Sequence, residues 1–430
     1  MATRVTTPTA PRVHRLSLSL ATRESLRIAL LSRGATFVVA FFASLGFTAG
    51  AHGVAARNAR RFDVAGVTHP FRSVLDLLLS PLARWDAVWY LSIAGTGYNG
   101  IRSRAAFFPL YPLLVRAVGE LGGALPGALL VASYCVSLAA FAGALFLLYR
   151  LVELELGRSL ATPTLLFLAL FPASFFFGAP YSESVFLLVS VGAFYAARTG
   201  RWAWAGILGA AASATRDTGV LMLIPLVVLY LWGPRLDRPE EAPRYRLKAD
   251  AGWLLLAPLG LVAYASYLWL AHGDPVAFMH VQTGWFRHLA APTAGVWDAV
   301  VAGFDGAKQL VRASGPHALL PASDLFQQAS LNLVLLGFLA FAIVATVGTL
   351  RRLPAAYGAY AVASLIVPLS YPVAGQPLMS LPRFLSVLFP LFMWVAIACE
   401  RRRLTPLAIG LSALGLGWLV TLFATWHWVA

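Results

Sequence analysis

The residues Arg84, Trp85, Asp86, Trp89 and Tyr90 place one carboxylate among aromatic rings and beside a guanidinium. Such a carboxylate can accept a proton from a hydroxyl group, which is the task of a general base. On a helix, residues four apart share a face, so Trp85 pairs with Trp89 and Asp86 with Tyr90. A second interpretation stays open: an interfacial helix carries Trp and Tyr at head-group level, with Asp86 solvated or paired with Arg84.

An aromatic run follows this stretch, from Tyr98 through Phe108 to Tyr111, with Pro109 and Pro112 three residues apart. Prolines that close together forbid a regular helix interior between them. The run therefore predicts a kinked aromatic wall. It lines a lipid groove or forms the entry into the next apolar segment, and the sequence leaves both open.

Charged residues also stand at the edges of later apolar segments. Glu183, just after Tyr181, falls where a helix begins, so we favour helix capping or support of a neighbouring side chain over catalysis. Arg216 and Asp217 separate two apolar segments, and they either line a functional site or pair with each other in a surface turn. Arg383 begins another such segment and is a candidate for binding a phosphate.

His272, His280 and His288 recur at eight-residue intervals, with Asp274 and Arg287 nearby. The histidines lack the tight ligand spacing of a zinc site, so we expect no metal. They are either phosphate or sugar contacts or solvated loop residues.

The elements that position these residues are membrane helices. Of the 430 residues, 59% are hydrophobic and 12% charged, whereas soluble proteins carry about a quarter charged residues. Apolar segments long enough to cross a bilayer recur along the chain. We expect an all-α polytopic integral membrane helix bundle in one domain, 28–430, after a basic segment, 1–27. About eleven transmembrane helices are expected, near 28–50, 125–149, 161–178, 183–198, 202–214, 218–232, 252–271, 331–350, 355–371, 384–399 and 404–428.

The net charge of +15 comes mostly from arginines clustered between apolar segments, which excludes a continuous nucleic-acid-binding face. Under the positive-inside rule these clusters place the N-terminus in the cytoplasm. The long loops 51–124 and 272–330 then lie outside, on the extracytoplasmic face. Loops of that length are usually functional. The short segments around Arg216 are typical of interrupted helices that bring polar groups into a protein-lined cavity.

Taken in order, the motifs resemble the PIG-V family of GT-C membrane glycosyltransferases. The motifs are Arg84-Trp85-Asp86 with Trp89-Tyr90, Gly97-Tyr98, Phe107 to Pro112, Pro180 to Ser184, Thr215-Arg216 with Gly219, and Pro382-Arg383-Phe384. Eukaryotic members add the second mannose of the glycosylphosphatidylinositol anchor from dolichyl-phosphate mannose, in the endoplasmic reticulum lumen. This chain looks like a bacterial relative in the inner membrane, so the family's acceptor does not carry over.

The resemblance implies an inverting hexosyl transfer, of mannose by the family's precedent, from a polyprenyl-phosphate sugar to a hydroxyl of a lipid-linked or cell-envelope glycan. Asp86, which occupies the position of the acidic residue in the first outer loop, is the implied general base. Arg383 or Arg216 is expected to stabilise the departing phosphate, without a metal or other cofactor. The expected substrate-binding residues are Arg84, Trp85, Trp89, Tyr90, Tyr98, Phe108, Tyr111, Tyr181, Glu183, Arg216, Asp217 and Arg383.

Two other classes of protein remain. In a transporter or lipid flippase, Asp86, Glu183, Arg216 and Arg383 would form a substrate or coupling pathway. Such proteins usually show internal repeats and charges near the bilayer midplane, and neither is evident in the sequence. A scaffolding subunit would leave Asp86 without a role. Loss of sugar transfer in Asp86→Ala separates the enzyme from both.

Overall fold

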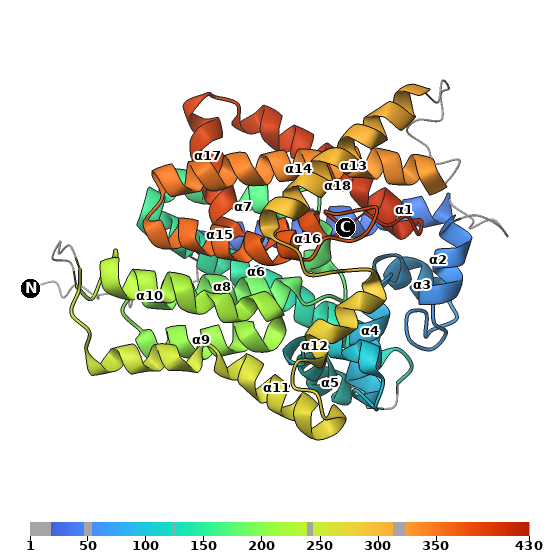
Figure 1. Cartoon of the computed structure of the whole chain (residues 1–430), viewed down its shortest axis with the longest axis horizontal. Helices are drawn as coiled ribbons and strands as arrows, with labels where there is room; N and C mark the ends of the chain where they lie inside the picture. Colours follow the sequence, from blue (N-terminus) through green and yellow to red (C-terminus); the bar gives the residue numbers. More distant parts are fainter. Residues whose placement is uncertain (1–18, 47–53, 124, 239–243, 313–323, 430) are drawn as a thin grey trace, which may run out of the picture.

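The computed structural model describes residues 19–46, 54–123, 125–238, 244–312 and 324–429, and within them the chain forms helices and no strand (Figure 1). Five helical segments in these ranges are long and apolar enough to cross a membrane. They are α1 (Leu20–Leu45), α6 (Ala128–Leu156), η5 with α11 (Ala249–His272), Gln328–Arg352 of α14 (Asp324–Arg352) and α18 (Thr405–Ala424). The expected all-α multi-pass membrane fold is confirmed, whereas the number of spans stays a prediction.

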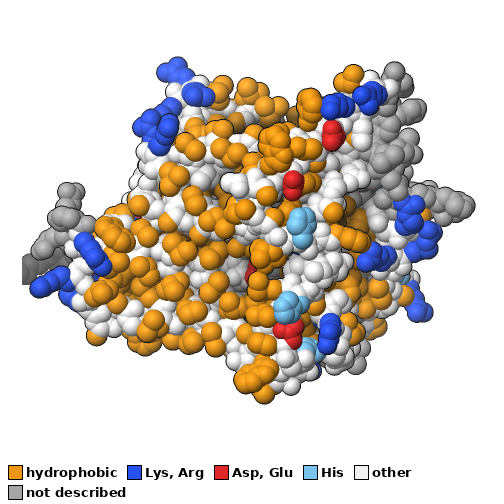
Figure 2. Space-filling model, in the orientation of Figure 1, with side chains coloured by type: hydrophobic (Ala, Val, Ile, Leu, Met, Phe, Trp, Pro, Cys, Tyr) orange, Lys and Arg blue, Asp and Glu red, His pale blue; other side chains and the backbone are white. Residues whose placement is uncertain are grey.

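Shorter apolar helices fill the space between the long ones: α7 (Arg158–Ala169), α8 (Glu183–Arg198), α9 (Trp202–Thr215), α10 (Leu223–Trp232), α15 (Ala355–Ser370) and α17 (Phe389–Arg401). In Figure 1, α6, α8, α9 and α10 lie alongside one another. On the face drawn in Figure 2, hydrophobic side chains cover the middle of the molecule and most charged side chains gather toward its ends. This distribution suits a helix bundle surrounded by lipid.

Prolines shorten two of the expected helices. The segment expected at 161–178 is α-helical only to Ala169, since Pro172 lacks the N–H that would continue the helix, and a 3-10 helix, η3 (Ser174–Gly178), follows. The segment expected at 384–399 is divided into α16 (Leu381–Ser386) and α17, and Pro390 occupies the first turn of the second piece. Ser174 and Ser386, close to the two breaks, are both buried.

Pro109 and Pro112 act differently from our expectation. Pro109 is the N-cap of α5 (Leu110–Glu120), and Pro112 falls in its first turn. The first N–H groups of a helix have no partner inside it, so proline is tolerated there. The two residues between these prolines are therefore helical, and the prolines start a helix instead of preventing one.

The two long loops fold into helices, most of them short, that pack on one end of the bundle (Figure 1). The first loop contains α2 (Val54–Phe62), α3 (Val74–Leu79), η1 (Ser80–Leu82), α4 (Ala87–Thr96), η2 (Arg102–Ala106) and α5. The second contains α12 (Ala277–His280), η6 (Val281–Trp285) and α13 (Pro292–Arg312). Contacts of η2 with α12 and η6 join the two loops. The charged residues singled out from the sequence meet beneath this junction.

Candidate active site

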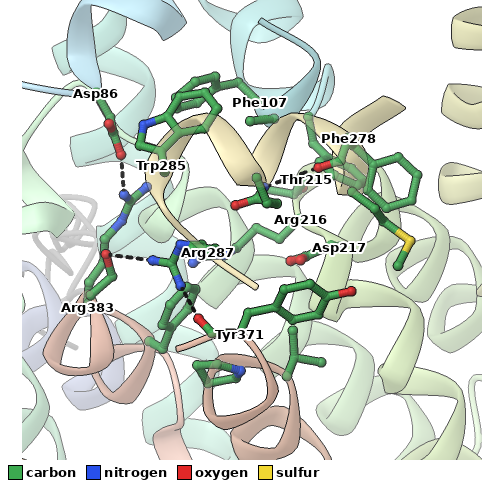
Figure 3. A pocket seen from close by; sticks show the side chains of 18 of the residues that line it. Asp86, Phe107, Thr215, Arg216, Asp217, Phe278, Trp285, Arg287, Tyr371 and Arg383 are labelled. Carbon is green, nitrogen blue, oxygen red and sulfur yellow. Dashed lines mark hydrogen bonds and ion pairs between the residues drawn. The ribbon is translucent and has the colours of Figure 1, made fainter. Parts of the chain in front are cut away.

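A cavity of about 370 Å³ opens beside Asp86, and we call it the Asp86 cavity (Figure 3). Its charged lining residues are Asp86, Arg216, Asp217, Arg287 and Arg383. Most of the other lining side chains are apolar, among them Phe107, Phe108, Val220, Leu221, Leu261, Phe278, Trp285, Val367, Pro368 and Phe384. The cavity thus combines three guanidinium and two carboxylate groups with an apolar wall.

Arg383 links two carboxylates from distant parts of the chain. Its Nη1 donates to Asp86 Oδ2 over 2.7 Å, and its Nε donates to Glu183 Oε1. Arg216 Nη1 donates to the same Glu183 oxygen over 2.6 Å. The Glu183 side chain is fully buried and does not line the cavity. A buried carboxylate is tolerable only with such partners, so Glu183 holds both arginines in place from behind.

A strained turn positions Asp86. Trp85 has φ of +56°, a conformation that costs a non-glycine residue about 1 kcal/mol or more. The turn is fixed by Tyr181, whose hydroxyl donates to Arg84 O over 2.8 Å and accepts from Asp86 N–H over 3.1 Å. Asp86 is the N-cap of α4 but makes no capping hydrogen bond with its side chain. Its carboxylate is therefore left for Arg383 and the cavity.

The helical pairing expected for the aromatic residues around Asp86 is only half present. Tyr90 accepts a hydrogen bond from Arg383 Nη2 over 3.4 Å, so it lies on the Asp86 side as expected. Trp85 precedes α4 and packs against Trp428, with ring centroids 4.9 Å apart. Trp89 stacks on Phe107 instead. The expected pair of Trp85 with Trp89 is wrong, because the helix begins two residues after Trp85.

Arg287, from the second long loop, is a cavity residue whose place the sequence did not reveal. Its guanidinium donates to Tyr371 O over 3.1 Å and to Ser380 Oγ over 3.4 Å, both uncharged acceptors. Burial lowers its pKa to about 10, against the opposing effects of Asp217 and Asp86, so the group stays charged at neutral pH. Among the hydrogen bonds of the described residues, Arg287 has no carboxylate acceptor, unlike Arg216 and Arg383.

Of the other expected substrate-binding residues, Tyr90, Phe108, Arg216 and Asp217 line the cavity with Asp86 and Arg383. The remaining ones do not: Arg84, Trp85, Trp89, Tyr98, Tyr111, Tyr181 and Glu183. Tyr181 and Glu183 contact cavity residues from behind, as described above.

Three of the residues outside the cavity, Arg84, Tyr98 and Tyr111, have partners elsewhere in the fold. Arg84 lies 3.5 Å from an Asp63 oxygen and 4.1 Å from the centre of the Trp426 ring, which removes it as the partner of Asp86. Tyr98 donates to Phe107 O over 2.7 Å, and the Tyr111 hydroxyl lies 3.0 Å from Ser137 Oγ. These two phenols fix the aromatic wall and do not face the cavity.

Arg287, Trp285, Tyr371 and Trp428 also line the cavity, although they were not among the expected substrate-binding residues. For Arg287 a signal existed, since a lone arginine follows Trp285 and Phe286 in a loop expected on the same side as Arg383. No local pattern marks Tyr371 or Trp428, because only the tertiary fold brings them to Asp86.

Fold and site together define a multi-pass membrane protein with an arginine-rich cavity at one end of its helix bundle. A family model described as Mannosyltransferase (PIG-V) matches residues 23–229, a range that holds Asp86, Glu183 and Arg216 but not Arg287 or Arg383. The match covers just under half of the chain, and the resemblance to the PIG-V family that the motifs predicted is confirmed.

Individual relatives match over a shorter range. GPI alpha-1,6-mannosyltransferase 2 of Rattus norvegicus is 34% identical over 156 residues, which are 34% of this chain and 31% of that protein. GPI mannosyltransferase 2 of Cryptococcus neoformans is 30% identical over 168 residues, or 37% of this chain and 40% of that protein. In Drosophila melanogaster the protein of that name is 32% identical over 127 residues, 27% of this chain and 28% of its own length. The matched part thus spans well under half of each relative.

Among solved structures, the archaeal oligosaccharyltransferase AglB from Archaeoglobus fulgidus, in complex with an inhibitory peptide and a dolichol-phosphate, aligns with 91% of this chain and 55% of its own. The two are 13% identical, with a TM-score of 0.38.

Proposed function

We propose that the chain is an inverting membrane mannosyltransferase that moves the sugar of a polyprenyl-phosphate donor to a hydroxyl of a lipid-linked or cell-envelope glycan. One observation carries the proposal: the Asp86 carboxylate lines a cavity together with Arg216, Arg287 and Arg383. Transfer from a sugar phosphate needs a base for the incoming hydroxyl and positive charge for the departing phosphate. Both are present, and the matched relatives are named as mannosyltransferases.

In this reaction Asp86 accepts the proton of the acceptor hydroxyl while that oxygen bonds to the anomeric carbon. The bond from this carbon to the phosphate oxygen breaks, and its electron pair leaves on the phosphate. Because attack and departure occur on opposite faces of the sugar, the configuration at that carbon is inverted. The ion pair with Arg383 Nη1, 2.7 Å away, orients the Asp86 carboxylate for this task.

Arg287 is the guanidinium best placed for the donor phosphate, because its present acceptors are uncharged oxygens. A phosphate that displaces a carbonyl from Arg287 exchanges a neutral hydrogen bond for a charge-assisted one. Arg383 and Arg216 are already bound to carboxylates and supply additional positive field. The apolar wall, with Leu261 and Phe278, suits the first isoprene units of the donor.

The reaction as proposed uses no metal ion and no cofactor, since arginine neutralises the phosphate. We place the cavity on the extracytoplasmic face of the bacterial inner membrane. The opposite end of α9 adjoins a loop with Arg235, Arg238, Arg244, Arg246 and Lys248, and the positive-inside rule puts such a loop in the cytoplasm.

The test is transfer of radiolabelled mannose from polyprenyl-phosphate mannose by membranes that contain the protein, with EDTA present. We expect a labelled glycan or glycolipid product from the wild type and none from Asp86→Ala at equal expression. GDP-mannose should not replace the lipid donor when it is offered to solubilised protein from which endogenous carrier lipid has been depleted. Movement of the donor across the bilayer without transfer would instead favour a transporter.

A further inference from the structure

A second cavity, of about 600 Å³, lies beside the Asp86 cavity, and we call it the Arg102 cavity. Its lining comes mainly from the two long loops: Arg61, Phe62, Trp89, Arg102, Ser103, His272, Asp274, Ala277, His280, Val281, Thr283, Gly284, Trp285 and Phe286. Trp285 and Met379 line both cavities, so the two share a wall. A molecule in the Arg102 cavity therefore lies next to the cavity that Asp86 lines.

The charge of the Arg102 cavity favours an anion. Arg61 and Arg102 contribute two guanidinium groups, and Asp274 is the one acidic residue in the lining. The Asp274 carboxylate already lies 2.8 Å from His280 Nδ1. Two arginines against one carboxylate leave the lining with a net positive charge. A phosphate or carboxylate group on a ligand balances that charge.

The rings of the cavity point to a polar, sugar-like ligand. Trp89 and Trp285 lie edge to face, with ring centroids 6.4 Å apart, and both line it. Tryptophan offers a wide apolar surface and one N–H donor, a combination suited to amphipathic rings. Trp89 Nε1 and His272 Nε2 are buried and have no hydrogen-bond partner among the described residues. Unpaired buried polar atoms are costly, and hydroxyl groups in the cavity can supply their partners after a small tilt of either ring.

We infer that the Arg102 cavity binds the acceptor of the transfer reaction, and that this acceptor is an anionic glycan whose phosphate or carboxylate lies between Arg61 and Arg102. That the ligand is the acceptor rests on the proposed function. That the cavity binds an anionic sugar is argued from the residues of the cavity alone. Trp89 stacks on Phe107, which lines the Asp86 cavity, so an acceptor hydroxyl reaches Asp86 past Trp89 and Trp285.

Binding of small probes to the whole protein in phosphatidylcholine nanodiscs tests the site without any need for transfer activity. The probes are mannose 6-phosphate, glucuronic acid and, as the neutral reference, mannose, measured by isothermal titration. We expect at least one charged sugar to bind about tenfold or more tightly than mannose. Comparing the phosphate with the carboxylate identifies which anion the cavity prefers.

Variants then locate the bound anion. Arg102→Gln should weaken binding of the charged sugar about tenfold and leave mannose unaffected. The matched control is Arg116→Gln, which removes an exposed arginine of the same loop outside the cavity. Equal binding by Arg102→Gln and the wild type would overturn the inference, as would absence of charged-sugar binding by the wild type. Loss in Arg287→Gln but not in Arg102→Gln would put the anion in the Asp86 cavity and also overturn it.

Failure of the proposed function has a different signature. In that case the wild type transfers no sugar from polyprenyl-phosphate mannose, while the charged sugar still binds and still depends on Arg102.

Discussion

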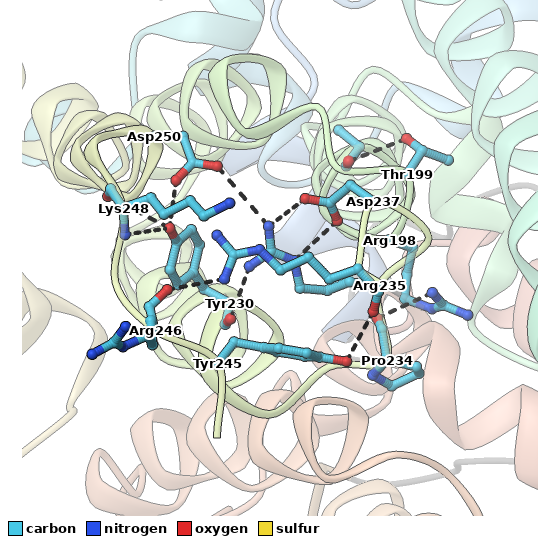
Figure 4. Close-up of polar contacts among 12 residues, drawn as sticks. Arg198, Thr199, Tyr230, Pro234, Arg235, Asp237, Tyr245, Arg246, Lys248 and Asp250 are labelled. Carbon is cyan, nitrogen blue, oxygen red and sulfur yellow. Dashed lines mark hydrogen bonds and ion pairs between the residues drawn. The ribbon is translucent and has the colours of Figure 1, made fainter. Parts of the chain in front are cut away.

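Two arginine clusters stand at opposite ends of α9, and they differ in what their guanidinium groups contact. Thr215 and Arg216, at one end, line the Asp86 cavity. Trp202, at the other, packs on Arg235, whose guanidinium carbon lies 4.4 Å from the centre of the indole ring. Figure 4 shows Arg235 with its polar partners, among them Asp237. A helix of this length separates the clusters by about 20 Å. We call the Arg235 cluster closed, because its guanidinium contacts protein groups, and the Asp86 cluster open, because its side chains line a cavity.

In the Arg235 cluster, each guanidinium nitrogen of Arg235 donates to an oxygen of the protein. Arg235 Nε donates to Asp237 Oδ1 over 3.0 Å, its Nη2 donates to Asp237 Oδ2, and its Nη1 donates to Tyr230 O over 3.0 Å. The Tyr230 ring lies 4.6 Å from the same guanidinium. This pattern joins the loop after α10 to the start of α9. It is what a structural arginine looks like when no ligand is needed.

In the Asp86 cluster, some polar groups are not fully paired with protein groups. The Asp86 side chain lines the cavity and is 18% exposed, Arg287 donates hydrogen bonds only to uncharged acceptors, and the second Glu183 oxygen has no partner among the described residues. Leaving such groups incompletely paired lowers stability, and proteins usually retain them where a substrate completes the pairing. The contrast predicts that substitutions at the two clusters affect different properties.

The largest effect is expected from Arg383→Gln. This change removes the shared partner of Asp86 and Glu183 and leaves two carboxylates near each other in a buried region. Transfer activity should become undetectable, and the free energy of unfolding should fall by about 3 kcal/mol. A radiolabel transfer assay and thermal unfolding in detergent measure the two effects. An active, stable variant would show that Arg383 does not organise the site.

Arg287→Gln should reduce kcat/KM for the lipid donor by about 10- to 100-fold while leaving stability close to that of the wild type. The side chain faces the cavity and has no bonded carboxylate that its loss would strand. Arg287→Lys should recover part of the activity, because it restores the charge but not the planar fork. If Arg287→Gln binds and uses the donor normally, another group holds the phosphate.

Arg235→Ala is the matched change in the closed cluster. It leaves the Asp237 carboxylate without its guanidinium and removes the packing on Trp202. The free energy of unfolding should fall by about 2–3 kcal/mol, with little change in activity per folded molecule. Thermal unfolding followed by transfer assays at low temperature would measure both. Selective loss of activity here would remove the distinction between the clusters.

The smallest effect is expected on the stability of the protein at acid pH. Burial alone would raise the pKa of Asp237, but the hydrogen bonds and charge of Arg235 outweigh it and lower the pKa below its usual 3.8. A lowered carboxyl pKa stabilises the fold above that usual value, and the stabilisation is lost as pH falls through the lower, folded value. The acid sensitivity of unfolding below about pH 4 should therefore decrease in Asp237→Asn, as measured by melting temperatures between pH 3 and 7.

The sequence predicted the helical membrane fold and most of the charged residues of the candidate active site. Apolar length marks spans, and an ionisable residue between them is conspicuous, so Asp86, Glu183, Arg216 and Arg383 were found. Their mutual contacts were not predictable, since Arg383 is nearly 300 residues from Asp86 and local periodicity says nothing about such pairs. The turn at Trp85 was missed because tryptophan rarely adopts a positive φ, and the tertiary contacts that impose it here are not visible in the sequence.

The Asp86 cavity as the place of chemistry is tested most directly by comparing Asp86→Asn with Asp237→Asn in one transfer assay. Each change neutralises one arginine-bound carboxylate, in the open and in the closed cluster. We expect Asp86→Asn to lower the rate of mannose transfer from polyprenyl-phosphate mannose by about 1,000-fold, within the range for loss of a general base, and Asp237→Asn to leave it within about twofold of the wild type. Equal rates for Asp86→Asn and the wild type would contradict the assignment of Asp86 as the base.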